Sequence, residues 1–190
     1  MEIRTGLSYG DALLVPQRSA VDSRSDIDLT AQLTPSLSLD IPIVSAAMDT
    51  VTEAETAAAL ADLGGLGVIH RFLSIEEQAA EVSTVAEQGG PVAAAVGIDE
   101  DYLDRTEAIL NAGGDAVVLD VAHGHMERAL DAVAEIRAEY DPELIAGNVV
   151  TPDAVEDLYD SGADCVKVGV GPGSHCTTRQ AAGAGYPQLS

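Results

Sequence analysis

The chain alternates short, fully apolar runs with longer segments in which apolar residues recur every three or four positions. Six apolar runs are present, at residues 41–48, 66–70, 92–98, 116–121, 144–150 and 165–171. Runs that lack polar alternation are typical of strands buried on both faces of a parallel sheet. The pattern therefore predicts six parallel strands.

The segments between the apolar runs predict five amphipathic helices, at residues 52–63, 74–88, 101–111, 126–140 and 152–160. Ser74 with Glu77 forms a capping-box pattern, and Thr151 stands as an N-cap before Pro152. Glycines follow four of these helices, where a C-terminus favours positive φ: Gly64, Gly89, Gly113 and Gly162.

Strand–helix alternation with short loops indicates the α/β class. A doubly wound sheet normally carries a glycine-rich phosphate turn after its first strand, and residues 48–50 contain no glycine. We therefore predict a (β/α)₈ TIM barrel in one domain over residues 1–190. A barrel needs eight strands and about 250 residues, so six strands predict a domain that is incomplete at its C-terminus. Residues 1–39 form a lead-in with few periodic signals.

Charge narrows the set of partners. The chain has 32 acidic and 9 basic residues and a formal net charge of −23, which disfavours nucleic acid and anionic lipid. No apolar run approaches the roughly 20 residues that cross a bilayer, and residues 1–10 lack an apolar signal segment, so we predict a cytoplasmic protein. Lys167 is the only lysine, and the acids are dispersed, which favours a salt-rich cytoplasm.

Reactive side chains gather where the predicted strands end, which is where barrels carry their chemistry. They are Asp49, His70, Arg71, Asp120, His123, His125, Asn148 and Cys176. A zinc site built from His123, His125, His175 and Cys176 is one alternative. We disfavour it, because a His-x-His pair on a turn does not match a recognised metal spacing.

The segment 169–185, GVGPGSHCTTRQAAGAG, is the most informative part of the chain. Alternating glycines let the backbone approach a ligand or ion closely. Cys176 lies among polar neighbours in this loop and is a candidate nucleophile, although an inert loop cysteine fits the spacing equally well. Cys165 opens an apolar strand and is interpreted as a small core residue.

Five motifs together resemble the IMP dehydrogenase and GMP reductase family. They are YGDALLVP at 9–16, VSAAMDTVTEA at 44–54, GLGVIHR at 65–71, AGNVVTP at 146–152 and VKVGVGPGSHCTTR at 166–179. The matches run through nearly the whole chain in the family's order, and the cysteine loop is highly specific.

The resemblance implies a (β/α)₈ barrel in which a cysteine bonds covalently to C2 of a purine mononucleotide, while hydride passes between C2 and a nicotinamide cofactor. Cys176 would then be the nucleophile. Thr178 would help to activate water or ammonia, and Ser174 would contact the nucleotide phosphate. Met48 and Asn148 would border the purine pocket.

The same resemblance implies a cofactor site and a cation site. Asp120 and Gly169 would contact the cofactor, which is either NADPH/NADP or NAD. Gly171, Gly173 and Cys176 would offer backbone carbonyls to a monovalent cation, commonly K⁺. A homotetramer is also implied.

Within the family, residues 87–91 leave no room for the CBS modules that dehydrogenases usually carry. Residues 120–122, Asp-Val-Ala in place of the dehydrogenase Asp-Ser-Ser, and the ending 185–190 resemble reductases, whereas residues 45–50 resemble dehydrogenases. We favour a GMP reductase, with an IMP dehydrogenase as the alternative. Because the residues that decide between them would follow Ser190, a non-catalytic fragment or half-barrel is a further alternative.

Overall fold

The computed structural model describes residues 5–190. The first four residues of segment 1–10, which was predicted to lack an apolar signal segment, therefore lie outside the described residues. The chain divides into two compact units. The larger unit is Leu29–Lys167, and the smaller combines the described part of Met1–Asp28 with Val168–Ser190. Most of the predicted elements fall in the larger unit.

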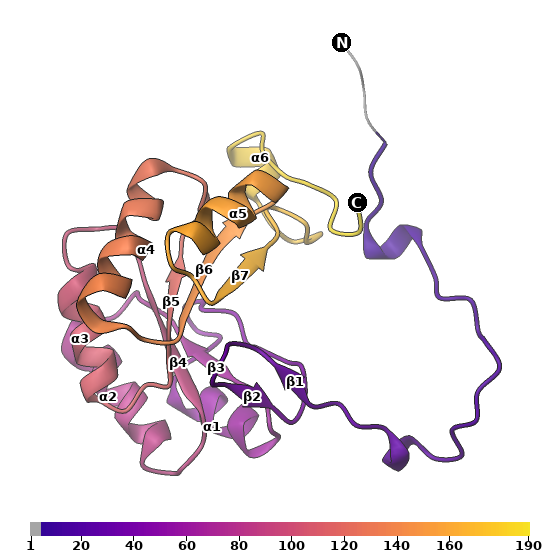
Figure 1. The fold of residues 1–190 in the computed structure, drawn as a ribbon, viewed down its shortest axis with the longest axis horizontal. Helices are drawn as coiled ribbons and strands as arrows, with labels where there is room; N and C mark the ends of the chain where they lie inside the picture. The colour runs from indigo at the N-terminus through magenta and orange to yellow at the C-terminus, as the bar shows by residue number, and fades with distance from the viewer. Residues whose placement is uncertain (1–4) are drawn as a thin grey trace. The chain divides into compact units, whose positions relative to one another are not determined.

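The larger unit is built around a parallel five-stranded sheet (Figure 1). The strands are β3 (Gly67–Ile69), β4 (Val92–Val96), β5 (Ala116–Asp120), β6 (Leu144–Val149) and β7 (Cys165–Val168), whose last residue already belongs to the smaller unit. They lie in the order β3-β4-β5-β6-β7. This unbroken order is that of a barrel and lacks the reversal of a doubly wound sheet. The α/β prediction is confirmed as a partial barrel.

The predicted helices all form: α1 (Ala54–Asp62), α2 (Ile75–Ala86), α3 (Tyr102–Asn111), α4 (Glu127–Tyr140) and α5 (Pro152–Asp160). The capping box of α2 is present, because the Glu77 amide donates to Ser74 Oγ at 3.2 Å and the Ser74 amide donates back to Glu77 Oε2 at 3.0 Å. Thr151 caps α5. The four predicted C-terminal glycines adopt positive φ, from 81° at Gly89 to 112° at Gly162.

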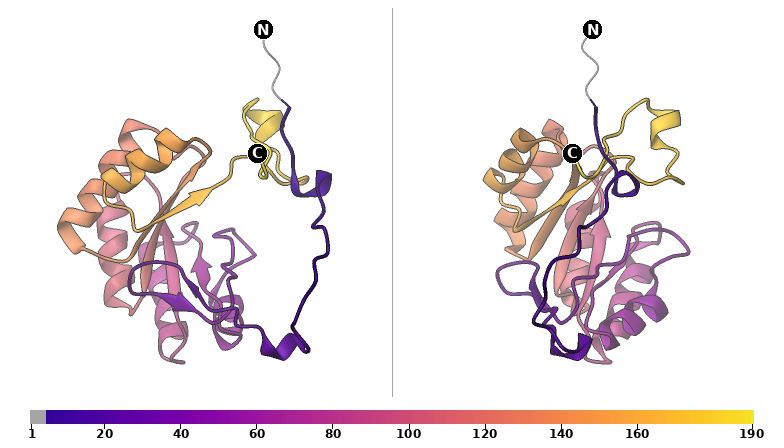
Figure 2. Two further views of the ribbon diagram at one scale, coloured as in Figure 1. Left: turned by 45° about the vertical axis from the view of Figure 1, so that its right-hand side comes forward. Right: turned by 90° about the vertical axis from the view of Figure 1, so that its right-hand side faces the viewer.

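The two faces of the sheet pack against different partners. Val117 and Leu119 of β5 join the core beneath the helices, which cover one face (Figure 2). Val118, between them, points to the opposite face and packs in a second core with Leu39. Leu39 belongs to a hairpin of β1 (Ala31–Gln32) and β2 (Ser38–Leu39), which the sequence pattern did not predict.

The prediction of a strand at residues 41–48 is wrong. It makes a single parallel bridge, from Val44 to Leu66. Pro42 has no amide hydrogen to donate, and the Ile43 and Met48 amides both donate to carbonyls two residues back, at 2.8 Å. The run therefore lies beside β3, where the first strand was expected, but its backbone is too turned to extend the sheet.

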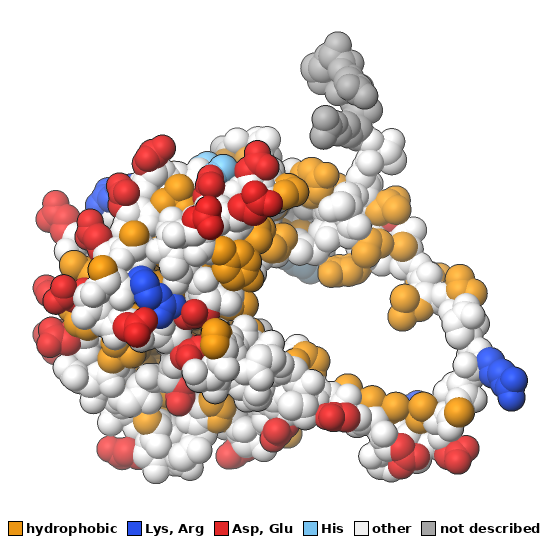
Figure 3. Space-filling view, viewed as in Figure 1, with side chains coloured by type: hydrophobic (Ala, Val, Ile, Leu, Met, Phe, Trp, Pro, Cys, Tyr) orange, Lys and Arg blue, Asp and Glu red, His pale blue; other side chains and the backbone are white. Residues whose placement is uncertain are grey.

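The smaller unit joins the two ends of the chain. The Leu189 amide donates to the Leu7 carbonyl at 3.0 Å, and the unit contains two 3₁₀ turns, Tyr9–Asp11 and Arg24–Asp26, and the short helix α6 (Thr178–Ala181). Among residues 5–190, no helix is both long and apolar enough to cross a membrane. Acidic side chains are spread over the helical layer of the larger unit, with few basic ones among them (Figure 3).

Candidate active site

The carboxyl ends of the parallel strands meet along one edge of the larger unit, and predicted site residues lie there. β5 and β6 are in register with Asp120 opposite Gly147, which places Asp120 next to Asn148 on the neighbouring strand. Asn148 is locked by its backbone, because its amide donates to the Val121 carbonyl at 2.9 Å and its carbonyl accepts from Gly124 at 2.8 Å. Its side-chain Oδ1 is buried without a partner within the described chain.

Asp120 forms an ion pair that sequence reasoning missed. Lys167 Nζ lies 2.8 Å from Asp120 Oδ1, although the two residues are 47 positions apart. Lys167 is the only lysine of a chain with eight arginines, and that exception was the one available signal of a special role. The pair fixes the orientation of a carboxylate at the edge of the sheet.

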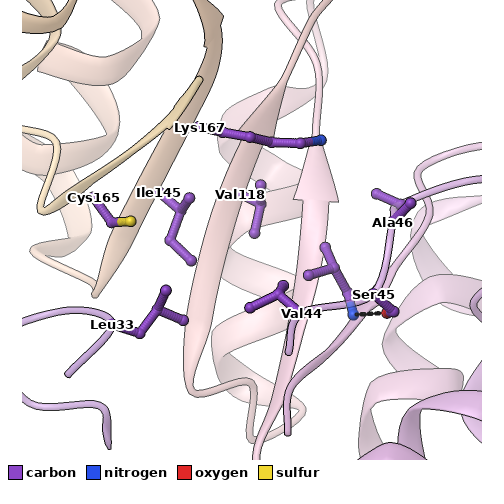
Figure 4. Close-up of a pocket in the computed structure, with 10 residues that line it drawn as sticks. Leu33, Val44, Ser45, Ala46, Val118, Ile145, Cys165 and Lys167 are labelled. Atoms are coloured by element: carbon purple, nitrogen blue, oxygen red, sulfur yellow. Dashed lines mark hydrogen bonds between the residues drawn. The ribbon is translucent and has the colours of Figure 1, made fainter. Parts of the chain in front are cut away.

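Below this pair lies an apolar cavity of about 340 Å³ on the sheet face opposite the helices (Figure 4). Its walls are Leu33, Val44, Ser45, Ala46, Ala47, Val68, Val118, Ile145, Cys165 and Lys167. Burial, with the nearby Asp164 charge, raises the pKa of the Cys165 thiol. A protonated, half-buried thiol is a poor nucleophile, in agreement with the interpretation of Cys165 as a packing residue.

Met48 lies in the same unit, on the loop between the Val44 bridge and α1. Its side chain is exposed, and its carbonyl accepts hydrogen bonds from the Val51 and Thr52 amides at 3.1 and 3.2 Å. The structure thus places Met48, Asp120 and Asn148 in the larger unit. The predicted cysteine-loop residues Gly169, Gly171, Gly173, Ser174, Cys176 and Thr178 all lie in the smaller unit.

In the smaller unit, Cys176 is paired with Thr178. The distance from Cys176 Sγ to Thr178 Oγ1 is 3.2 Å. The hydroxyl of Thr178, then its backbone amide and the Arg179 charge, stabilise the thiolate and lower the pKa of Cys176. The loop reaches this geometry through Gly169 and Gly171, with φ of 139° and 59°, values that L side chains rarely adopt. A lowered pKa increases the thiolate fraction, which a nucleophilic cysteine would require.

One of the three predicted cation carbonyls, that of Gly173, already accepts hydrogen bonds within the loop. The Gly173 carbonyl accepts from Arg179 Nη2 at 3.0 Å and from the Cys176 amide at 3.2 Å, which uses both of its lone pairs. A cation at this carbonyl would replace the hydrogen bond from the Arg179 guanidinium. The K⁺ site stays a prediction.

Two other predicted features have local partners. Ser174 Oγ lies 3.2 Å from His175 Nδ1, so this hydroxyl is part of the loop's own hydrogen bonding. His125 Nε2 lies 2.7 Å from Asp157 Oδ2 on α5. The second contact gives His125 a carboxylate partner within the larger unit.

Comparison with known proteins shows which family the chain belongs to. The model of a family described as "IMP dehydrogenase / GMP reductase domain" matches residues 6–190. The chain belongs to this family. Three relatives, all named inosine-5'-monophosphate dehydrogenase, are similar over nearly the whole chain. That of Borreliella burgdorferi is 37% identical (98% of the chain, 59% of the relative). That of Nitrosopumilus maritimus is 32% identical (100% of the chain, 66% of the relative). That of Cryptosporidium parvum is 37% identical (99% of the chain, 57% of the relative).

The chain thus spans between 57% and 66% of the length of these three members of the IMP dehydrogenase/GMP reductase family. None of the three is named a GMP reductase, so the prediction of that reaction finds no support in them. The names of all three relatives support the alternative, an IMP dehydrogenase.

Proposed function

We propose that this chain supplies the cysteine loop and most of the nucleotide-binding edge of an IMP dehydrogenase. The observation that carries the proposal is the pairing of Cys176 with Thr178 at 3.2 Å in a glycine loop, which lowers the pKa of the thiol. The names of the relatives favour IMP over GMP as the substrate.

In the proposed reaction, the Cys176 thiolate adds to C2 of the purine. The C2 hydride leaves, which oxidises C2, and the sulfur remains attached as a thioimidate. Water then adds to C2, the C2–S bond breaks, and Cys176 departs as a thiolate with release of a proton and XMP. Thr178 donates a hydrogen bond to the thiolate before attack and orients the water afterwards. Ser174 would bind the phosphate, and Met48 and Asn148 would hold the purine.

The bound NAD would supply the hydride acceptor. The residues fit such a group, because Asp120 holds a carboxylate at the strand edge and its Oδ1 is anchored by Lys167 at 2.8 Å. A ribose hydroxyl of the dinucleotide would donate to the second oxygen, Oδ2, and Gly169 would let the backbone approach. A monovalent cation, commonly K⁺, at the backbone carbonyls of Gly171, Gly173 and Cys176 stays a prediction; at Gly173 it would compete with two hydrogen bonds that the carbonyl already accepts.

We propose one barrel domain without CBS modules, as the sequence predicts; the chain contributes five of its strands and the segment 41–48 beside β3. The alignment with the Nitrosopumilus relative covers 315 positions, 125 more than the 190 residues of the chain, which supports the lack of an internal insert here. A cytoplasmic location and a homotetramer stay predictions, and sedimentation would test the tetramer.

A GMP reductase is the second candidate. It is favoured by Asp120-Val121-Ala122 and by the lack of CBS modules. The deciding experiment follows NADH formation with IMP and NADPH consumption with GMP, in a chain completed to eight strands. NADH formation alone supports our proposal, whereas NADPH consumption alone makes the protein a GMP reductase. If the completed chain shows neither, it is no catalyst of this family's reactions.

A further inference from the structure

His70 is a buried histidine directly after β3 to which the proposed reaction assigns no role. Its side chain is 1% exposed. Nδ1 accepts a hydrogen bond from the Phe72 amide at 3.2 Å, which places the proton of a neutral ring on Nε2. Nε2 faces two carboxylates of the preceding loop, Glu53 Oε1 at 3.4 Å and Asp49 Oδ1 at 4.0 Å. Its ring therefore presents a hydrogen-bond donor to that loop.

These three groups also lie close enough together to resemble a set of metal ligands. A histidine binds a metal through a nitrogen lone pair, and Nε2 has none to offer while Nδ1 serves as the acceptor for Phe72. The cluster is thus better suited to holding the loop than to holding an ion.

The loop of residues 48–53 needs such a tether. Thr50 has a φ of 60°, a left-handed conformation that is strained for a β-branched residue. Glu53 occupies the N-cap position of α1, yet its side chain makes no capping hydrogen bond and is directed to His70. The His70 amide adds a second tie, to the Thr52 carbonyl at 3.4 Å.

The anchor itself is rigid. Gln78, fully buried on α2, donates to the carbonyls of His70 at 3.0 Å and of Ala95 at 2.8 Å. Arg105 donates in turn to Gln78 Oε1 at 3.1 Å. His70 is therefore fixed to the ends of β3 and β4, and what it holds is fixed to the edge of the sheet.

We propose that His70 is a positioning residue that ties the loop of residues 48–53 to the sheet and so sets the affinity for the purine nucleotide through Met48. The inference rests on the proposed function, in which Met48 borders the purine. His70 itself touches no reacting atom, so its effect falls on KM more than on kcat.

The test compares two substitutions that divide the ring's two contacts. In His70→Asn, the amide oxygen can still accept from Phe72, but no donor reaches Glu53. In His70→Gln, the longer side chain restores a donor near the position of Nε2. We expect His70→Asn to raise KM for IMP about fivefold, because the carboxylates are half exposed, while kcat changes less than about twofold. His70→Gln should recover most of the loss.

Hydrogen exchange of the Val51 and Thr52 amides, read on the chain itself without turnover, tests the tether separately. We expect faster exchange in His70→Asn than in wild type. Glu53→Gln weakens the same tie without touching the buried ring and should act likewise, whereas Glu55→Gln on the exposed side of α1 is the matched control.

Unchanged exchange in both His70→Asn and Glu53→Gln would overturn the tether. Faster exchange with an unchanged KM would overturn its link to the nucleotide. A parallel fall in kcat, equal in the Asn and Gln variants, would mean a merely structural role. If the completed wild-type enzyme makes no NADH from IMP, the proposed function fails instead, and the exchange data still decide whether the tether exists.

Discussion

Replacing Gln78 by leucine should destabilise the larger unit without changing the volume of its core much. The change removes the donor to the His70 and Ala95 carbonyls and the acceptor for Arg105 Nη1. Three buried hydrogen bonds at about 1 kcal/mol each, partly offset by the apolar leucine, give a loss of about 2–3 kcal/mol. For a chain of this size that lowers Tm by roughly 5–10 °C.

The assay is thermal unfolding followed by circular dichroism, at a salt concentration where the wild type is folded. Gln88→Leu is the matched control, since Gln88 is exposed after α2 and its amide reaches only the Thr84 carbonyl one turn back. The control should shift Tm by less than about 2 °C. If Gln78→Leu melts as the control does, the Gln78 network does not hold the ends of β3 and β4, and the rigid anchor assigned to His70 is refuted.

Three further predictions concern the thiols and the charge. Cys176 should be alkylated by iodoacetamide well before Cys165 at neutral pH, because their pKa values are shifted in opposite directions; equal rates by peptide mass spectrometry would refute this. Thr178→Val should move the pH midpoint of Cys176 alkylation upward, since the hydroxyl that stabilises the thiolate is lost; an unmoved midpoint would discount that hydrogen bond. With a net charge of −23, Tm should rise from 0.01 M to 1 M KCl as the Debye length falls from about 30 Å to about 3 Å, and a flat or falling Tm would contradict a salt-adapted surface.

Much of the fold could be predicted because its elements leave local signals. Fully apolar runs predicted β3 to β7, and the capping box at Ser74 predicted the start of α2. The failures have physical reasons too. The run at residues 41–48 is apolar enough for a strand, but Pro42 and two short turns use its backbone differently. The hairpin β1–β2 has two residues in each strand, too few to produce a periodic pattern.

The candidate site could be predicted only where its chemistry is local in sequence. Cys176 and Thr178 are two residues apart, so a loop motif was enough to pair them. The ion pair of Lys167 with Asp120 depends on the strand order, which places only β6 between β5 and β7, and no spacing along the chain predicts it. The contact of Arg179 with the Gly173 carbonyl depends on the loop's own conformation, so the sequence did not predict it.

In the proposed function, Cys176 carries the purine during the reaction. The direct measurement is to mix the completed enzyme with IMP and NAD, quench with acid during turnover, and map the modified peptide by mass spectrometry. We expect a purine nucleotide bound to the Cys176 peptide, formed together with NADH and absent in Cys176→Ala. NADH formation without any adduct in the wild type, or an adduct on Cys165, would contradict it.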